Sequence, residues 1–428
     1  MLEQPYFGRR LRMLRLARGL SQAGLVGQGM STGYLSRLES GERPPTERAV
    51  TYLARRLGVD PSVLTGPSDG RPLTGILAAV TSAPPGADDT SALCRAVEED
   101  AGEDPAARWQ ALWLLSRAAD RDGDRELERT RLAELVDLSD RLNAPELRAR
   151  SRVQFARCAR SLGDMRAAEA AAVEALCVAR TEELAVADTL SALIALIGVE
   201  TELGKLEAAG RHVAELERDL LVRAAPAQAA EALWTAAVVS SRQGDDTTAR
   251  TRLETALSLL EGRDDLALWT RLRVAAADAA LQMSPPRVAA AERRLGEAAA
   301  VLRLVGTPGQ LQEVRALEAH LAFHQGRLDD ARALSQALLA EEDLRLSYRE
   351  RVRLSVLDGR LKILADRADE GIAALRRLGR QATESANLDL AAHVWQSLAT
   401  TLADVRPHDT APGAAERPGS GRQRDRCP

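Results

Sequence analysis

Aromatic residues are scarce in this chain, and cysteines are few. Phe, Trp and Tyr make up only 3% of its 428 residues, whereas hydrophobic residues as a whole make up 45%. Alanine and leucine supply most of the apolar content, which favours helix over sheet. We expect reduced thiols, because the four cysteines show neither metal-binding nor redox spacing; they are Cys94, Cys158, Cys177 and Cys427.

The chain also lacks the sequence signatures of several functional classes. No apolar run reaches transmembrane length and the N-terminus does not resemble a signal peptide, so we expect a cytoplasmic protein that does not bind membranes. Phosphate-binding Gly-Lys-Ser/Thr loops, Gly-x-Ser-x-Gly and His-Glu-x-x-His are all missing. His320 and His324 stand at i and i+4 without an evident third ligand. We therefore expect no metal, no cofactor and no enzymatic activity.

Charge is unevenly distributed along the chain, although the formal net charge at pH 7 is only −4. Residues 1–66, the head, carry ten arginines and five acidic residues, a net charge of +5. The other 362 residues carry 48 basic and 57 acidic residues, a net charge of −9. A basic segment on an acidic remainder favours a polyanionic partner at one end only.

Residues 21–41 predict two short helices joined by a tight turn. Ser21 and Ser31 can each cap a helix, because a serine hydroxyl accepts an unpaired N–H of the first turn. Leu35 and Leu38 are three residues apart, so they share one face of the second helix and can be buried. A helix with an apolar inner face and small polar residues outside suits insertion into the major groove. The outward-facing positions are Thr32, Gly33, Ser36 and Arg37.

Several separated motifs within residues 6–66 resemble the Cro/phage-repressor (Xre-type) helix-turn-helix domain. They are Gly8-Arg9-Arg10-Leu11, Gly19-Leu20-Ser21-Gln22, Tyr34-Leu35-Ser36-Arg37-Leu38-Glu39-Ser40-Gly41, Pro44-Pro45 and Leu53-Ala54-Arg55-Arg56-Leu57-Gly58-Val59. The resemblance implies a lambda-repressor-like fold of five helices that binds double-stranded DNA. The fifth helix is expected to begin at Asp60-Pro61. Gly24 stands where the family usually has an acidic residue, so no capping box is expected from Ser21.

The resemblance also assigns roles to individual positions. Gln22 is expected to reach a phosphate, and Thr32, Gly33 and Arg37 occupy base-facing positions. Arg37 either binds a guanine edge through two hydrogen bonds or contacts phosphate only. The remaining predicted DNA contacts are Ser31, Tyr34, Ser36 and Arg43.

Arg15 and Glu39 match a pair that, in the family, ties the first helix to the third. We expect them to be structural, because a paired guanidinium is a poor DNA ligand.

Pro- and Gly-rich sequence separates the head from the rest of the chain. Two such stretches, residues 66–72 and 82–89, lie around a short apolar run near Ile76. We predict a linker over residues 67–90 that lets the head move. The C-terminal residues 405–428 are rich in Pro, Gly and charge and are predicted to be a disordered tail.

Residues 91–404, the body, show an internal repeat. Small turn residues recur at intervals of about 40 residues, at Gly123, Gly163, Gly204, Gly244, Ser284, Gly326 and Asp366. Small residues that let helices approach closely follow five positions later, at Ala168, Ala209, Ala249, Ala289, Ala331 and Gly371. Glu128 follows Gly123 instead, so the first unit is atypical, as a capping unit tends to be.

The repeated turns resemble those of degenerate tetratricopeptide repeats. The resemblance implies an α-solenoid of stacked helix hairpins with a concave surface. A head and body of these types together resemble the peptide-pheromone-sensing regulators of Gram-positive bacteria. In that family, asparagines in the groove hold the peptide backbone, whereas this chain has only Asn143 and Asn387. A peptide, a small molecule and a protein therefore all remain open as the effector.

The sequence thus predicts an all-α transcriptional regulator. Its head would bind a palindromic operator, and its body would form a homodimer and sense an effector. The alternative is a protein–protein adaptor whose repeats do the main work while the head serves as a tether.

Overall fold

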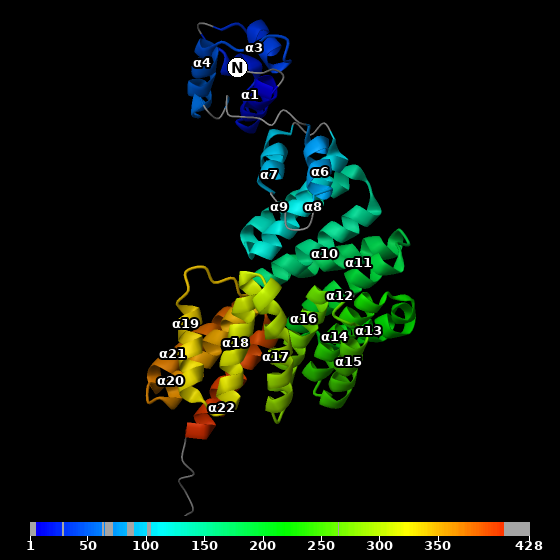
Figure 1. The fold of residues 1–428 in the computed structure, drawn as a ribbon, viewed down its shortest axis with the longest axis vertical. Coiled ribbons are helices and arrows are strands. Elements are labelled where there is room, and N and C mark those ends of the chain that lie inside the picture. The colour runs from blue at the N-terminus through cyan, green and yellow to red at the C-terminus, as the bar shows by residue number, and fades with distance from the viewer. Residues whose placement is uncertain are drawn as a thin grey trace, which may run out of the picture.

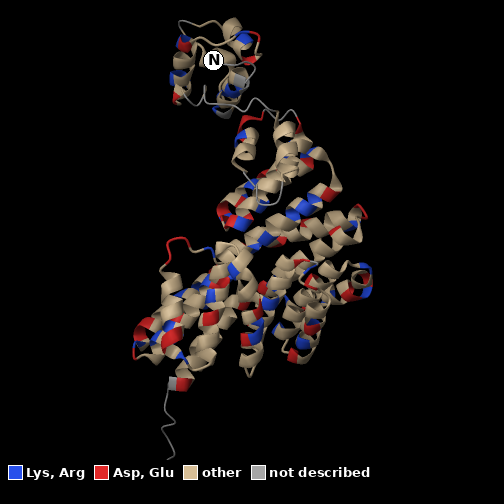
Figure 2. Ribbon diagram, viewed as in Figure 1, with Lys and Arg blue, Asp and Glu red and all other residues tan. Residues whose placement is uncertain are grey.

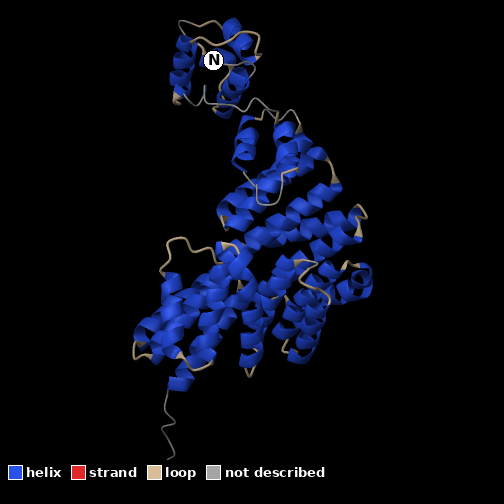
Figure 3. Ribbon diagram, viewed as in Figure 1, coloured by secondary structure: helices blue, strands red, loops and turns tan. Residues whose placement is uncertain are grey.

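The computed structural model describes residues 6–27, 30–61, 64, 72–83, 90–100, 104–263 and 265–405. Helices and their connecting turns make up these residues, which contain no β-strand (Figure 3). The predicted all-α fold is therefore confirmed. Residues of both charge signs are distributed over the head and the body (Figure 2).

The head forms a small helical unit at one end of the molecule (Figure 1). Its helices are α1 (Tyr6–Ala17), α2 (Gln22–Leu25), α3 (Thr32–Glu39) and α4 (Glu47–Leu57). Val50, Leu53 and Leu57 of α4 are buried, and they pack with leucines of α1 and α3. The predicted fifth helix lies mostly outside the described residues, although the side chain of Leu64 is buried in the head core.

A helix occupies part of the segment predicted to be a linker. This helix, α6 (Leu73–Thr81), buries Leu73, Ile76 and Leu77 in one cluster with apolar residues of α7 (Thr90–Glu99) and α8 (Pro105–Asp122). The apolar run near Ile76 thus forms a helix rather than an extended linker. Packing of its apolar side chains against α7 and α8 removes them from water and stabilises the helix.

Seven helix pairs follow, and α22 (Leu388–Val405) ends the described chain. The pairs are α8 with α9 (Arg125–Leu142), α10 (Pro145–Leu162) with α11 (Met165–Thr181), α12 (Val186–Glu202) with α13 (Leu206–Glu215), α14 (Pro226–Arg242) with α15 (Asp246–Ser258), α16 (Leu266–Gln282) with α17 (Val288–Val305), α18 (Pro308–His324) with α19 (Leu328–Leu339), and α20 (Tyr348–Leu364) with α21 (Ala368–Glu384). A π-helical turn (Leu216–Leu220) and a 3-10 turn (Leu221–Arg223) extend α13.

The predicted turn residues lie between the two helices of each pair. Six of the seven have positive φ, a conformation that glycine adopts without a Cβ penalty; they are Gly123, Gly163, Gly204, Gly244, Gly326 and Asp366. The predicted repeat is therefore confirmed at the level of the backbone.

The small residues predicted after each turn are buried in every pair except one. Ala168, Ala209 and Ala331 are fully buried, but Ala289 is exposed, so this prediction was wrong. The turn containing Pro285-Pro286 has five residues, whereas the turns of the other pairs have two or three, and α17 begins only at Val288. Ala291 therefore occupies the buried position, with an exposure of 0%.

The C-terminal half of the body packs onto the N-terminal half. Helices α18, α20 and α22 contact α8, α10 and α12 respectively. The turn glycine Gly163 lies directly under Tyr348, because a Cβ at Gly163 would be 2.7 Å from the ring. Gly204 lies next to Leu388, since a Cβ at Gly204 would be 3.5 Å from the Leu388 Cβ. The superhelix therefore closes on itself through its turn residues.

None of the described helices is both long and apolar enough to cross a membrane. The tail predicted to be disordered falls almost wholly on residues 406–428, which lie outside the described residues.

Candidate nucleic-acid interface

Both helices of the helix-turn-helix stretch begin at serine caps. The Ser21 hydroxyl accepts the Gly24 N–H at 3.0 Å, and the Ser31 hydroxyl accepts the Tyr34 N–H at 3.1 Å. Each bond satisfies one of the N–H groups that the first turn of a helix leaves unpaired. The caps therefore fix where α2 and α3 begin, as the sequence predicts.

Helix α3 has one buried face and one open face. Leu35 and Leu38 are both 0% exposed, and burial of each leucine stabilises the head by roughly 1.5–3 kcal/mol. The opposite face is solvent-exposed and carries four of the eight predicted DNA contacts, Thr32, Gly33, Ser36 and Arg37.

Gly33 leaves an opening on the exposed face of α3. No atom lies within 4 Å of the point where a Cβ would be. The Arg37 guanidinium folds back along the helix, and its Nε donates to the Gly33 carbonyl at 3.2 Å. Arg37 must therefore exchange this contact within its own helix for any contact with a DNA base.

Arg15 of α1 and Glu39 of α3 form a buried ion pair. Arg15 Nε and Nη2 donate to the two Glu39 carboxylate oxygens at 2.6 and 2.9 Å, with side-chain exposures of only 8% and 4%. The bond to Glu39 raises the pKa of Arg15, so the guanidinium remains charged. Arg15 Nη1 also donates to the Leu20 carbonyl at 2.7 Å. The pair thus ties α1, the turn before α2 and the end of α3 together.

The sequence did not reveal that Gln22 belongs to this arrangement. Its Nε2 donates to Glu39 at 2.8 Å. The side chain predicted to reach a phosphate is therefore oriented by the carboxylate that holds Arg15. Its contact with DNA stays a prediction, since no nucleic acid is present.

Tyr34 and Arg43, both predicted DNA contacts, lie next to each other. The Arg43 guanidinium lies over the Tyr34 ring, 5.1 Å from its centroid. The Arg43 N–H also donates to the Arg37 carbonyl at 3.2 Å, which holds the loop against the end of α3. One cationic edge therefore borders the exposed face of α3.

Two further residues position this interface without being predicted to do so. Arg56 of α4 donates from Nε to the Leu25 carbonyl at 3.1 Å and from Nη2 to the Gly24 carbonyl at 3.0 Å. Gly8 lets α1 approach α3, because a Cβ there would overlap the Leu38 carbonyl oxygen. Both residues belong to resemblance motifs, but the motifs alone did not assign them these contacts.

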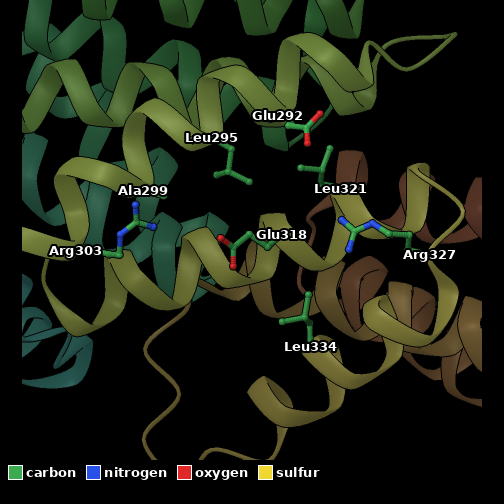
Figure 4. Close-up of a pocket in the computed structure, with 9 residues that line it drawn as sticks. Glu292, Leu295, Ala299, Arg303, Glu318, Leu321, Arg327 and Leu334 are labelled. Carbon is green, nitrogen blue, oxygen red and sulfur yellow. The ribbon is translucent and has the colours of Figure 1, made fainter.

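The body offers a pocket of about 360 Å³ between α17, α18 and α19 (Figure 4). Three leucines and two carboxylate–arginine combinations line it, including Glu318, Arg303 and Arg327. Its charges balance, so it favours neither an anion nor a cation.

The two asparagines considered as peptide ligands have structural roles. Asn143 ends α9 in the left-handed conformation, with a φ of 50°. Asn387 is 1% exposed; its Nδ2 donates to Glu202 at 3.2 Å, and its Oδ1 accepts the Leu390 N–H. Among the described residues, no group of three His, Cys, Asp or Glu side chains is placed to hold a metal.

Comparison with known families identifies the head. Residues 7–65 match the family described as a helix-turn-helix domain. The N-terminal part of the chain is therefore a helix-turn-helix domain, as its caps and buried stripes indicate. Comparison with curated proteins finds no match.

Two solved structures are similar to most of the chain. One is a Rap protein in complex with Competence and Sporulation Factor, at 10% identity and a TM-score of 0.51, covering 93% of this chain and 96% of that one. The other is PlcR of Bacillus thuringiensis in complex with the peptide PapR7 and DNA, at 14% identity and a TM-score of 0.33, covering 78% of this chain and 99% of that one. The likeness to the Rap protein shows that the helical-repeat fold is shared.

Proposed function

We propose that this protein is a transcriptional regulator that binds a specific DNA operator. One observation carries the proposal: α3 exposes Thr32, Gly33, Ser36 and Arg37, while its opposite face is anchored in the head core. A helix anchored in this way can enter the major groove without losing its own packing. The match of residues 7–65 to a helix-turn-helix family supports the same function.

Base readout would depend on the two long or branched side chains of the exposed face. Arg37 would bind the guanine edge through two hydrogen bonds, a contact worth about 1–3 kcal/mol of discrimination. Thr32 would add a contact to a neighbouring base, and Gly33 would allow close approach of the helix backbone. Tyr34, Arg43 and Gln22 would contact phosphates on either side, which fix orientation without carrying sequence information.

The body would supply dimerisation and effector sensing. Two heads on one duplex require half-sites about 10 base pairs apart, or a multiple of that spacing. An effector that binds one arrangement of the body more tightly than another would change the spacing of the heads. The body would act as a tetratricopeptide-like solenoid in the cytoplasm, with no catalytic step.

Duplex binding by the purified full chain tests this proposal. We expect affinity to fall steeply with salt concentration, because phosphate contacts release counterions. Binding to a specific sequence should persist in the presence of excess random DNA. The matched pair of variants is Arg37→Ala and Arg377→Ala, since Arg377 is an exposed arginine on α21 of the body. Equal affinity of both variants for the specific duplex, or binding that does not respond to salt, would contradict the proposal.

A further inference from the structure

The first helices of successive pairs line the inner surface of the body. Each contacts the first helix of the next pair from α10 through α20, and α20 in turn contacts α22. Because α20 and α22 also contact α10 and α12, this row of helices closes into a ring. Side chains from distant parts of the sequence therefore meet inside the body.

Ion pairs join the two halves of the body at this place. Arg160 of α10 binds Glu202 at 2.8 Å, and Arg349 of α20 approaches the same carboxylate at 3.5 Å. Arg242 of α14 pairs with Asp389 of α22 at 3.0 Å. The contacts of Arg349 and Arg242 join helices that are far apart in the sequence, so they hold the closed shape of the body.

Arg353 of α20 is the most buried arginine of this cluster and has an unsatisfied donor. Its side chain is 9% exposed, and it pairs with Asp278 of α16 at 2.7 Å through Nη2. Its Nε has no hydrogen-bond partner in the part of the chain that the structure describes. A buried donor without an acceptor costs roughly 1–3 kcal/mol, so this N–H favours an added acceptor.

Solvent can reach the groups around Arg353. Side-chain exposures are 21% for Arg349, 24% for Arg242 and 25% for Asp278. The cluster is therefore lined by polar groups that are partly exposed to solvent.

The arginines of the cluster outnumber its paired carboxylates, which favours binding of an anion. Four arginines, Arg160, Arg242, Arg349 and Arg353, meet three carboxylates, Glu202, Asp278 and Asp389. His320 and His393 complete the surroundings. Burial, and after it the charge of Arg353, lowers the pKa of His320 to about 3 and that of His393 to about 4. Both imidazoles are consequently neutral near pH 7, and the four arginines and three carboxylates named here carry a net charge of +1.

We propose that this cluster is the binding site for the anionic group, a carboxylate or a phosphate, of a small effector. The anion would accept a hydrogen bond from Arg353 Nε and draw on the excess charge of the neighbouring arginines. The site deepens the proposed function, because it assigns a chemical class to the effector that the regulator senses.

Binding would act on the closure of the body. Asp389 accepts a hydrogen bond from Arg349 and also pairs with Arg242. An anion near these two arginines would therefore compete with Asp389 for their guanidinium groups. Weaker pairing with Asp389 loosens the contact of α22 with α14 and α20. The effector would in this way favour a more open superhelix, which is a differential interaction of the kind that a switch requires.

Histidine signals of the full-length protein give a direct test without DNA. The chain has only five histidines, so a sample labelled at the imidazole carbons gives few NMR signals. Inorganic phosphate and succinate are each titrated at constant pH, with sodium chloride holding the ionic strength constant. We expect saturable shifts of the His320 and His393 signals and none for His212, which lies on α13 beside Glu200. The anion that saturates at the lower concentration identifies the phosphate or the carboxylate class.

Variants then connect these shifts to the guanidinium. We expect Arg353→Gln to weaken anion binding at least tenfold by calorimetry, and Arg377→Gln to leave it unchanged. If Arg353→Gln fails to fold, the NMR titration of the unmodified chain with phosphate and succinate tests the proposal by itself. No saturable shift with either anion, or equal shifts of all histidine signals, would overturn the proposal. Because these measurements contain no DNA, their failure is distinct from a failure of operator binding.

Discussion

Arg10 of α1 forms an ion pair with Glu99, the last residue of α7, and so joins the head to the helices that follow it. The two side chains are 16% and 23% exposed, and burial lowers the pKa of Arg10. The sequence predicts a head that moves freely on its linker. The pair links α1 to α7, whose apolar residues pack with those of α6 and α8. We therefore expect it to limit the movement of the head.

Reversing one charge of this pair should release the head. We expect Arg10→Glu to place two carboxylates together and to make the head tumble faster, as measured by NMR relaxation of its amides. The double variant Arg10→Glu with Glu99→Arg restores opposite charges and should restore slow tumbling. Equal relaxation of the single variant and the unmodified chain would show that this pair does not hold the head.

Closure of the body depends on the turn residue Gly163. We expect Gly163→Ala to destabilise the body, because alanine must adopt a φ of +85° and its methyl group would overlap the Tyr348 ring. Gly244→Ala is the matched control, since its φ is +83° and no atom lies within 4 Å of its Cβ. The control should cost about 1–2 kcal/mol from backbone strain, and Gly163→Ala should cost more.

Urea unfolding followed by tryptophan fluorescence measures both costs, and small-angle scattering reports whether Gly163→Ala expands the body. Identical stability and scattering of the two variants would contradict the closed arrangement.

Because the Arg15–Glu39 ion pair is buried, replacing Glu39 should strongly destabilise the head. Glu39→Gln removes the countercharge of Arg15 while keeping the shape of the side chain. Leaving one member of a buried ion pair unpaired typically costs about 3–5 kcal/mol. Faster hydrogen exchange of the α1 and α3 amides would report this loss. Glu47→Gln, at the exposed start of α4, should leave exchange nearly unchanged.

Acid should destabilise the body through its buried histidines. The pKa values of His320 and His393 are about 3 and about 4, whereas an unfolded histidine titrates near 6.5. Between pH 6.5 and 4 the unfolded chain binds protons that the folded chain does not, so stability falls as pH falls. Each histidine contributes at most about 1.4 kcal/mol per pH unit.

Replacement of His320 by Asn should reduce this pH dependence. Urea midpoints of both proteins at pH 8, 6 and 5 measure the change, with pH 8 as the reference at which both imidazoles are neutral. A variant with the same loss of stability on acidification as the unmodified chain would contradict the assignment to His320.

The sequence predicted where most helices begin and end, because helix caps and turn residues act on the backbone next to them. Caps such as Ser31 and turn residues such as Gly163 act within a few residues of their own position. The prediction failed at Ala289, where two prolines lengthen the turn and shift the buried position to Ala291. That shift follows from the course of the backbone through the turn, which spacing alone does not reveal.

Contacts between distant residues were not predictable. The hydrogen bond of Gln22 to Glu39 depends on the angle between α2 and α3, and a resemblance to a family does not specify it. The meeting of Arg349 with Glu202 depends on the accumulated curvature of the whole body. The spacing of the repeats does not determine that curvature, so the sequence could not predict the charged cluster inside the body.

The most direct test of the central claim is selection of bound sequences from a random duplex library at low salt, with the unmodified protein and two variants. We predict that the unmodified protein enriches an inverted repeat and that Arg37→Ala loses the preference at one base pair of each half-site. Gln22→Ala should weaken all sequences alike without changing the preference. The absence of any enriched sequence with the unmodified protein, or an unchanged preference in Arg37→Ala, would contradict base readout by α3.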